Sequence, residues 1–152
     1  MRWLTLAIDL AVRNVADGGG PFGAVVVREG ELVATGVNRV TADLDPTAHA
    51  EVAAIRAACR ATGDFALHGA ELYSSCEPCP LCLATVLWAR VARVEYAAGR
   101  ADAAAAGFDD AVFHGMLAAE PGAWTGRLAH APHPRSAEPF AAWLEHGGRQ
   151  SY

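Results

Sequence analysis

Apolar residues recur along this chain with two different periods, and the alternation of these periods predicts a mixture of helices and strands. Over residues 3–15 the apolar positions fall three or four apart, which is typical of an amphipathic helix. Two short valine-containing runs follow at residues 23–28 and 32–37, with a Glu-Gly-Glu turn at 29–31 between them. Such a pair of runs predicts a β-hairpin.

Helical and strand-like patterns alternate through the rest of the chain up to residue 118. Helices are predicted at residues 48–61, 79–90, 102–106 and 111–118, and strands at 71–74 and 91–97. Prolines interrupt residues 120–139, where 127–131 carry a weak strand pattern, and residues 139–146 predict a last amphipathic helix. This order predicts an α/β protein in which residues 1–152 form one domain of three α/β/α layers, with a central mixed sheet of about five strands.

Charge and composition exclude several classes of protein. The chain of 152 residues has a net charge of −5 and contains no lysine, so we expect no nucleic-acid partner that is bound by phosphate neutralisation. Asp9 and Arg13 interrupt the first apolar stretch, which argues against a signal peptide, and no apolar run approaches the length of about eighteen residues that a membrane span needs. We expect a cytoplasmic protein, because reducing conditions suit cysteine thiolates.

The residues with the clearest chemistry are a histidine, a glutamate and a pair of cysteines. His49 and Glu51 form a His-x-Glu pair, and Cys79 and Cys82 follow about thirty residues later in Pro-Cys-x-x-Cys. One histidine and two cysteines fill three corners of a zinc tetrahedron and leave the fourth for water, which distinguishes a catalytic zinc site from a structural one. This motif is the known signature of zinc-dependent nucleobase deaminases.

The spacing of these residues predicts where they lie on their helices. Cys79 and Cys82 share one face of a first helical turn. His49 and Glu51 are two residues apart, so they converge only at a helix start, for which Thr47 is the predicted N-cap. The sequence therefore predicts two helix N-termini that face each other across a zinc ion.

A closed, structural zinc site is the alternative that must be weighed against a catalytic one. Cys76, three residues before Cys79, is the candidate for a fourth ligand, although a buried apolar role is commoner for such a cysteine. Glu51 argues against a non-catalytic zinc module, since a purely structural site has no use for that carboxylate. Cys59 falls on a predicted helix and is assigned to the core.

These residues resemble the cytidine-deaminase-like superfamily, and they are most similar to its bacterial guanine deaminase branch. The zinc motif is specific for the superfamily, whereas a Gly-Phe-Asp-Asp sequence and an aromatic tail select the branch. The resemblance runs from about residue 5 to the end of the chain, and the segments that carry it are residues 20–25, 45–52, 75–83, 88–90, 102–110, 139–143 and 152.

The resemblance implies a cytidine-deaminase-like fold that converts a free base, guanine first, to xanthine and ammonia. It implies that Zn²⁺ is held by the histidine and the two cysteines of the motif and that Glu51 moves protons. It further implies a homodimer in which the segment at about 137–152 is swapped between subunits and closes the neighbour's site. The implied substrate contacts are Asn38, Asp110, Phe22, Trp88 and Tyr152, with Asp109 as the alternative to Asp110.

Other substrates remain open at this stage. A transfer-RNA adenosine deaminase shares the zinc motif, but the acidic charge, the absence of lysine and the Gly-Phe-Asp-Asp sequence at 107–110 argue against it. Cytosine or an ammeline-type triazine are alternative small substrates. Residues 118–135 match no pattern of the family, so the entrance to the pocket is not predicted.

Overall fold

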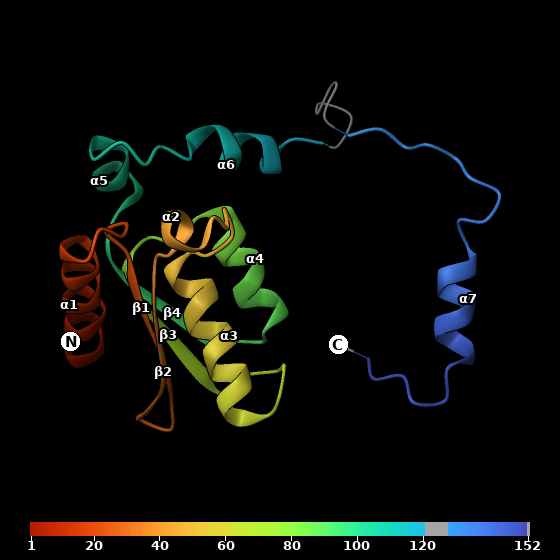
Figure 1. The fold of residues 1–152 in the computed structure, drawn as a ribbon, viewed down its shortest axis with the longest axis horizontal. Coiled ribbons are helices and arrows are strands. Elements are labelled where there is room, and N and C mark those ends of the chain that lie inside the picture. Colours follow the sequence, from red (N-terminus) through yellow and green to blue (C-terminus); the bar gives the residue numbers. More distant parts are fainter. Residues whose placement is uncertain (121–127, 152) are drawn as a thin grey trace.

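The computed structural model describes residues 1–120 and 128–151 of the chain. A mixed four-stranded sheet lies at its centre, in the order β2-β1-β3-β4 (Figure 1). β1 pairs antiparallel with both β2 and β3, whereas β4 runs parallel to β3. The strands are β1 (Gly23–Arg28), β2 (Glu31–Val37), β3 (Ala70–Cys76) and β4 (Arg93–Ala98).

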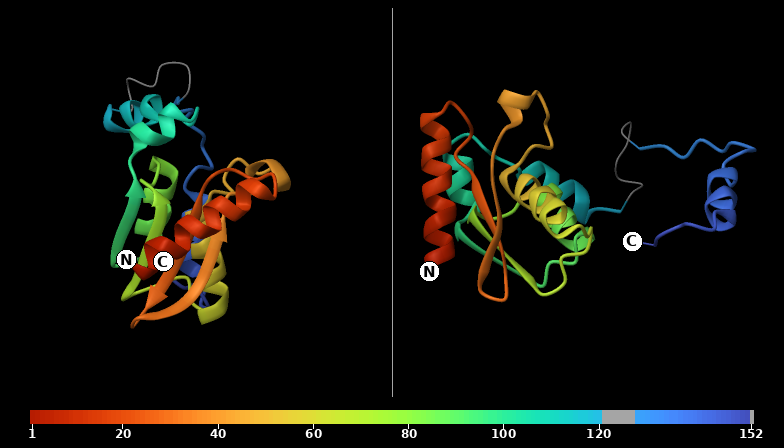
Figure 2. Two further views of the ribbon diagram at one scale, coloured as in Figure 1. Left: turned by 90° about the vertical axis from the view of Figure 1, so that its left-hand side faces the viewer. Right: turned by 60° about the horizontal axis from the view of Figure 1, so that its bottom comes forward.

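Helices cover both faces of this sheet, which confirms the predicted three-layer α/β/α architecture (Figures 1 and 2). α1 (Arg2–Ala16) covers one face, and α3 (Ala50–Thr62) and α4 (Pro80–Trp88) cover the other. Strand alternation divides the core in two, because successive side chains of a strand point to opposite faces. Val25 and Val27 of β1 therefore pack against α1, while Val26 packs against α3.

The remaining described helices are short and lie near the ends of the strands or beyond them. They are α2 (Val40–Asp43), α5 (Arg100–Ala105), α6 (Ala111–Ala118) and α7 (Glu138–Glu145). In Figures 1 and 2, α7 stands apart from the layered body, and its apolar side chains Phe140, Trp143 and Leu144 are exposed. None of the described helices has the length and apolar character needed to cross a membrane.

Two predictions about the elements were wrong in detail. About five strands were predicted, but the described residues form four, and residues 128–131 of the expected fifth strand are not in a strand. The first metal-bearing helix begins at Ala50 and not at residue 48, with His49 and not Thr47 at the N-cap position. Thr47 is held elsewhere, because its N–H and its hydroxyl both donate to Asp45 Oδ1, at 2.8 and 2.7 Å.

Glycines allow the helices to lie close to the sheet. A Cβ at Gly36 of β2 would lie 2.3 Å from the carbonyl oxygen of Ala50, and one at Gly23 of β1 would lie 2.3 Å from that of Ala7. Both distances are far below van der Waals contact, so a side chain at either position would push a helix away. The close approach at Gly36 fixes the position of the first turn of α3, where the zinc motif begins.

Candidate active site

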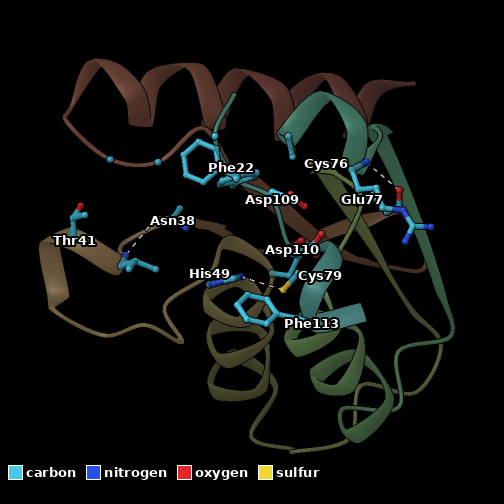
Figure 3. Close-up of a pocket in the computed structure, with 18 of the residues that line it drawn as sticks. Phe22, Asn38, Thr41, His49, Cys76, Glu77, Cys79, Asp109, Asp110 and Phe113 are labelled. Atoms are coloured by element: carbon cyan, nitrogen blue, oxygen red, sulfur yellow. Dashed lines mark hydrogen bonds and ion pairs between the residues drawn. The ribbon is translucent and has the colours of Figure 1, made fainter. Parts of the chain in front are cut away.

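Two helix N-termini meet at one end of a pocket, and they carry the residues of the zinc motif (Figure 3). His49 is the N-cap of α3 and Cys79 is the N-cap of α4, and both have extended backbone. Pro80 occupies the first turn of α4, where the missing N–H costs no intrahelical bond, and Cys82 follows on that turn. An N-cap side chain reaches past the end of its helix, so the two helices can bring their ligands together.

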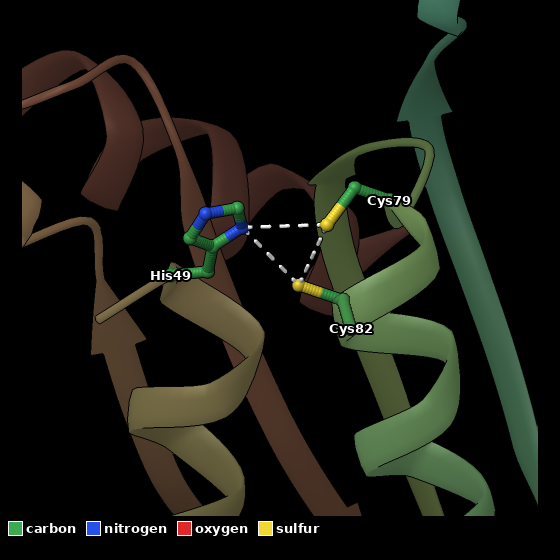
Figure 4. Close-up of side chains that lie close together, drawn as sticks. All are labelled: His49, Cys79 and Cys82. Carbon is green, nitrogen blue, oxygen red and sulfur yellow. Dashed lines mark hydrogen bonds between the residues drawn. The ribbon is translucent and has the colours of Figure 1, made fainter. Parts of the chain in front are cut away.

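The three candidate ligand atoms form a compact triangle (Figure 4). His49 Nδ1 lies 3.4 Å from Cys79 Sγ and 3.5 Å from Cys82 Sγ, and the two sulfurs are 3.6 Å apart. In a tetrahedral zinc site with ordinary bond lengths, the nitrogen–sulfur and sulfur–sulfur edges are about 3.6 and 3.8 Å. The donor set and its spacing therefore fit a zinc ion with one open position.

Cys76 lies outside this triangle. Among the described residues, the group of His, Cys, Asp and Glu side chains that could hold a metal contains only His49, Cys79 and Cys82. The thiol of Cys76 instead points to the carbonyl oxygen of Gly99, at 3.9 Å. The geometry therefore gives no support to the closed, four-ligand alternative.

The two metal-site thiols have opposite shifts in acidity. The hydrogen bond between the two sulfurs, together with the contact between Cys79 and His49, lowers the pKa of Cys79 to about 4. The same sulfur–sulfur hydrogen bond and burial raise the pKa of Cys82. A cation bound to both sulfurs would take them as thiolates, as is usual for cysteine ligands.

Glu51 is a buried carboxylate beside the metal triangle. It occupies the first turn of α3 and is only 6 % exposed. Ser74 Oγ donates to its Oε1 at 3.1 Å, and Cys82 Sγ donates to its Oε2 at 3.3 Å. Burial raises the pKa of Glu51, which favours a group that can hold a proton as well as release one.

A pocket of about 490 Å³ is lined by His49, Cys79 and Glu51. Figure 3 shows His49 and Cys79 in this pocket together with other lining residues. The pocket lining includes three of the five predicted substrate contacts, Phe22, Asn38 and Asp110, and also Asp109, the alternative to Asp110. Trp88 is not part of it: this side chain is 61 % exposed at the end of α4 and lines a separate surface hollow with Gln150. Tyr152 lies outside the described residues.

The polar groups of the pocket are held by their neighbours. The backbone N–H of Asn38 donates to the carbonyl oxygen of Phe22 at 3.1 Å, and its side-chain Oδ1 accepts from the N–H of Val40 at 3.3 Å. Asp110 Oδ2 lies 3.1 Å from His114 Nε2, one helical turn away. The Oδ1 of Asp109 accepts from the N–H of Ala111 at 2.9 Å, so Asp109 is the residue whose side chain supports the start of α6.

Several pocket residues were not predicted from the sequence. Phe108 packs edge-on against Phe22, with ring centroids 5.0 Å apart and planes at 87°. Phe113 of α6 and Thr41 of α2 also line the pocket. Phe108 belongs to the Gly-Phe-Asp-Asp sequence, so that motif was the signal for it. Thr41 had no comparable signal, because α2 is too short to show a period.

Comparison with known proteins gives matches over the whole chain. A family model described as the cytidine and deoxycytidylate deaminase zinc-binding region matches residues 1–98. Guanine deaminase of Bacillus subtilis (strain 168) is 44% identical over 151 residues, which cover 99% of this chain and 97% of that protein. A crystal structure of guanine deaminase from Bacillus subtilis superposes with a TM-score of 0.94 at 43% identity, again covering 99% of this chain and 97% of that chain.

A second kind of relative matches a smaller share of the chain. The transfer-RNA-specific adenosine deaminase of Agrobacterium fabrum is 47% identical, but over 78 residues, which cover 51% of this chain and 51% of that protein. The similarity to guanine deaminase thus includes the segment after the zinc motif. The similarity to the transfer-RNA adenosine deaminase covers about half of each chain.

Proposed function

Because this chain belongs to the cytidine and deoxycytidylate deaminase family, we propose that it hydrolyses guanine to xanthine and ammonia at a zinc ion held by His49, Cys79 and Cys82. The observation that carries the proposal is the buried carboxylate of Glu51 beside a three-ligand metal triangle at the base of a pocket. Similarity to a guanine deaminase over nearly the full length of both chains supports the choice of base.

The chemistry divides between the metal and Glu51. A bound zinc ion would lower the pKa of a coordinated water to about 7. Glu51 would accept one proton of this water as the water oxygen bonds to the amine-bearing ring carbon, and would deliver that proton to the adjacent ring nitrogen. It would then carry the second proton of the water, from the new hydroxyl group, to the amine. The carbon–nitrogen bond breaks, the amine leaves as ammonia, and the carbon keeps the oxygen that makes the product xanthine. The raised pKa of Glu51 suits a residue that both accepts and donates in one cycle.

Asn38 and Asp110 are proposed to recognise the base. The Oδ1 of Asn38 is occupied by the N–H of Val40, which leaves its amide N–H groups to donate to a ring carbonyl. Asp110, whose Oδ2 faces His114, offers its Oδ1 as an acceptor for an N–H group of guanine, whereas Asp109 Oδ1 supports the start of α6. Phe22 and Phe108 form an aromatic wall on which a flat ring can pack.

The C-terminal segment is proposed to complete this site in a homodimer. The apolar side chains of α7 are exposed within one chain, and such an unpacked amphipathic helix has an apolar face that is available to another subunit. Exchange of an identical element between protomers is a low-cost route to dimers. In this proposal the segment 137–152, with Tyr152 at its end, covers the pocket of the partner.

A panel of substrates tests the proposed function directly. Purified zinc-loaded protein is incubated with guanine, cytosine, ammeline, guanosine and transfer RNA, and ammonia is measured at equal concentrations of deaminable groups. We expect the fastest release from guanine. Efficient deamination of adenosine in transfer RNA with no release from guanine would establish the rival activity instead.

A further inference from the structure

β3 contributes a buried hydroxyl to the candidate active site. Ser74 is 1 % exposed and lies on the same face of β3 as Leu72, which packs in the core beneath α3. A polar side chain at such a position is stable only when it is hydrogen-bonded. Its partner is Glu51, whose Oε1 lies 3.1 Å from Ser74 Oγ.

The contacts of Ser74 set the direction of this hydrogen bond. The backbone N–H of Cys76 donates to Ser74 Oγ at 3.4 Å. The hydroxyl oxygen thus accepts from the backbone, and its own proton is directed to the carboxylate of Glu51. The loop that leads to the zinc ligands and the carboxylate beside them are therefore joined through one side chain.

The carboxylate of Glu51 has two side-chain donors among the described residues. Ser74 Oγ donates to Oε1 at 3.1 Å, and the thiol of Cys82 donates to Oε2 at 3.3 Å. Cys82 is one of the candidate metal ligands, so Ser74 is the donor to Glu51 that lies outside the metal triangle.

We propose that Ser74 is a positioning residue that anchors Oε1 of Glu51 and so directs Oε2 toward the metal and the substrate. The inference rests on the proposed function of Glu51. The last torsion of a glutamate side chain is broad and weakly restrained, so the carboxylate needs a hydrogen bond to keep one orientation. Proton transfer depends on that orientation, because a general base must lie within hydrogen-bonding reach of the proton it takes.

Four variants separate positioning from packing. Ser74→Ala removes the hydroxyl, and Ser74→Val and Ser74→Thr form an isosteric pair in which only Thr keeps it. Ser75→Ala is the matched control, since Ser75 is also buried on β3 but accepts from the N–H of Gly23, at 3.1 Å, and not from the active site. Turnover of guanine, its KM and the zinc content are measured for each zinc-loaded protein.

The proposal predicts a loss in kcat that the hydroxyl rescues. Loss of a hydrogen bond to a charged group should lower kcat about 10–100-fold in Ser74→Ala and Ser74→Val, with KM changed less than about twofold. Ser74→Thr should recover to within about threefold of wild type, and Ser75→Ala should match wild type. Zinc content should stay at one ion per chain throughout. Equal kcat for Ser74→Thr and Ser74→Val would overturn the proposal.

Crystal structures of the zinc-loaded variants supply a readout that needs no substrate. We expect the Glu51 carboxylate to rotate or to occupy two orientations in Ser74→Val, and to keep a single orientation in Ser74→Thr. An unchanged carboxylate in both would reject the positioning role even if guanine is not the substrate. If guanine is inert but the carboxylate moves, the proposed function fails and the positioning role stands.

Discussion

Gly36 is the position at which one added methyl group should disturb the active site from a distance. An ideal Cβ there would lie 2.3 Å from the Ala50 oxygen and 2.4 Å from the Ala54 nitrogen, whereas ordinary contact begins at 3.4 Å. Both clashing atoms belong to the backbone of α3, so no side-chain rotation can relieve them. In Gly36→Ala the helix must therefore withdraw from β2 by about 1 Å, as in other overpacked cores.

This displacement should affect both the stability of the protein and its affinity for zinc. Overpacking of this kind costs about 1–3 kcal/mol of the free energy of unfolding. The same shift moves His49 relative to Cys79 and Cys82, and a metal site tolerates changes in ligand distance of only about 0.2 Å. Gly36→Ala should therefore lose stability and bind zinc more weakly.

Urea denaturation and zinc competition against a chelator measure the two effects. Gly115→Ala is the control, because a Cβ at Gly115 meets nothing within 4 Å and the residue lies within α6. It should leave zinc affinity unchanged and stabilise its helix by about 0.5–1 kcal/mol. If Gly36→Ala unfolds at the same urea concentration as wild type and holds zinc as tightly, the argument from close packing is wrong.

Two further predictions concern the rim of the pocket. Asn14 Nδ2 donates to the carbonyl oxygens of Gly20 and Asn38, both at 2.8 Å. Asn14→Asp would place a carboxylate oxygen against these two carbonyl oxygens. We expect it to lower the free energy of unfolding by about 1–3 kcal/mol and to raise the KM for guanine. If the urea midpoint and the KM are both unchanged, the hydrogen bonds of Asn14 do not hold the pocket in shape. Deletion of residues 148–152 should impair turnover without changing the zinc content, and a fully active truncated protein would refute the proposed role of the tail.

The sequence predicted the layers well because they depend on periodicity over long segments. The valines of β1 alternate between two cores, and α1 shows a clear amphipathic stripe, so both were predicted within a residue or two. The short helix α2 was missed because four residues are too few to show a period. Thr47 was a plausible cap by composition, but the acceptor Asp45 two residues earlier engages its hydroxyl.

In the candidate site, too, local spacing could be predicted from the sequence, whereas contacts between residues far apart in the chain could not. The spacing of Cys79 and Cys82 is local, so their shared helical turn could be predicted from sequence. The contact between Ser74 and Glu51 joins residues 23 positions apart, and no local pattern indicates it. Trp88 was assigned to the pocket by resemblance. Within one chain it is the last residue of α4, whereas the metal ligands lie at the start of that helix, and it lines a separate hollow.

Formation of xanthine from guanine by wild type and by Glu51→Gln tests the central claim most directly. Both proteins are loaded with zinc, their metal content is measured, and the product is followed by ultraviolet absorbance. We expect one zinc ion per chain in each, and a rate in the variant that is lower by about 10⁴-fold, the upper end of the range for a general acid–base group. A variant that keeps its zinc and more than about a tenth of the wild-type rate would contradict the role of Glu51. A zinc-loaded wild type that forms no xanthine would contradict the proposed reaction.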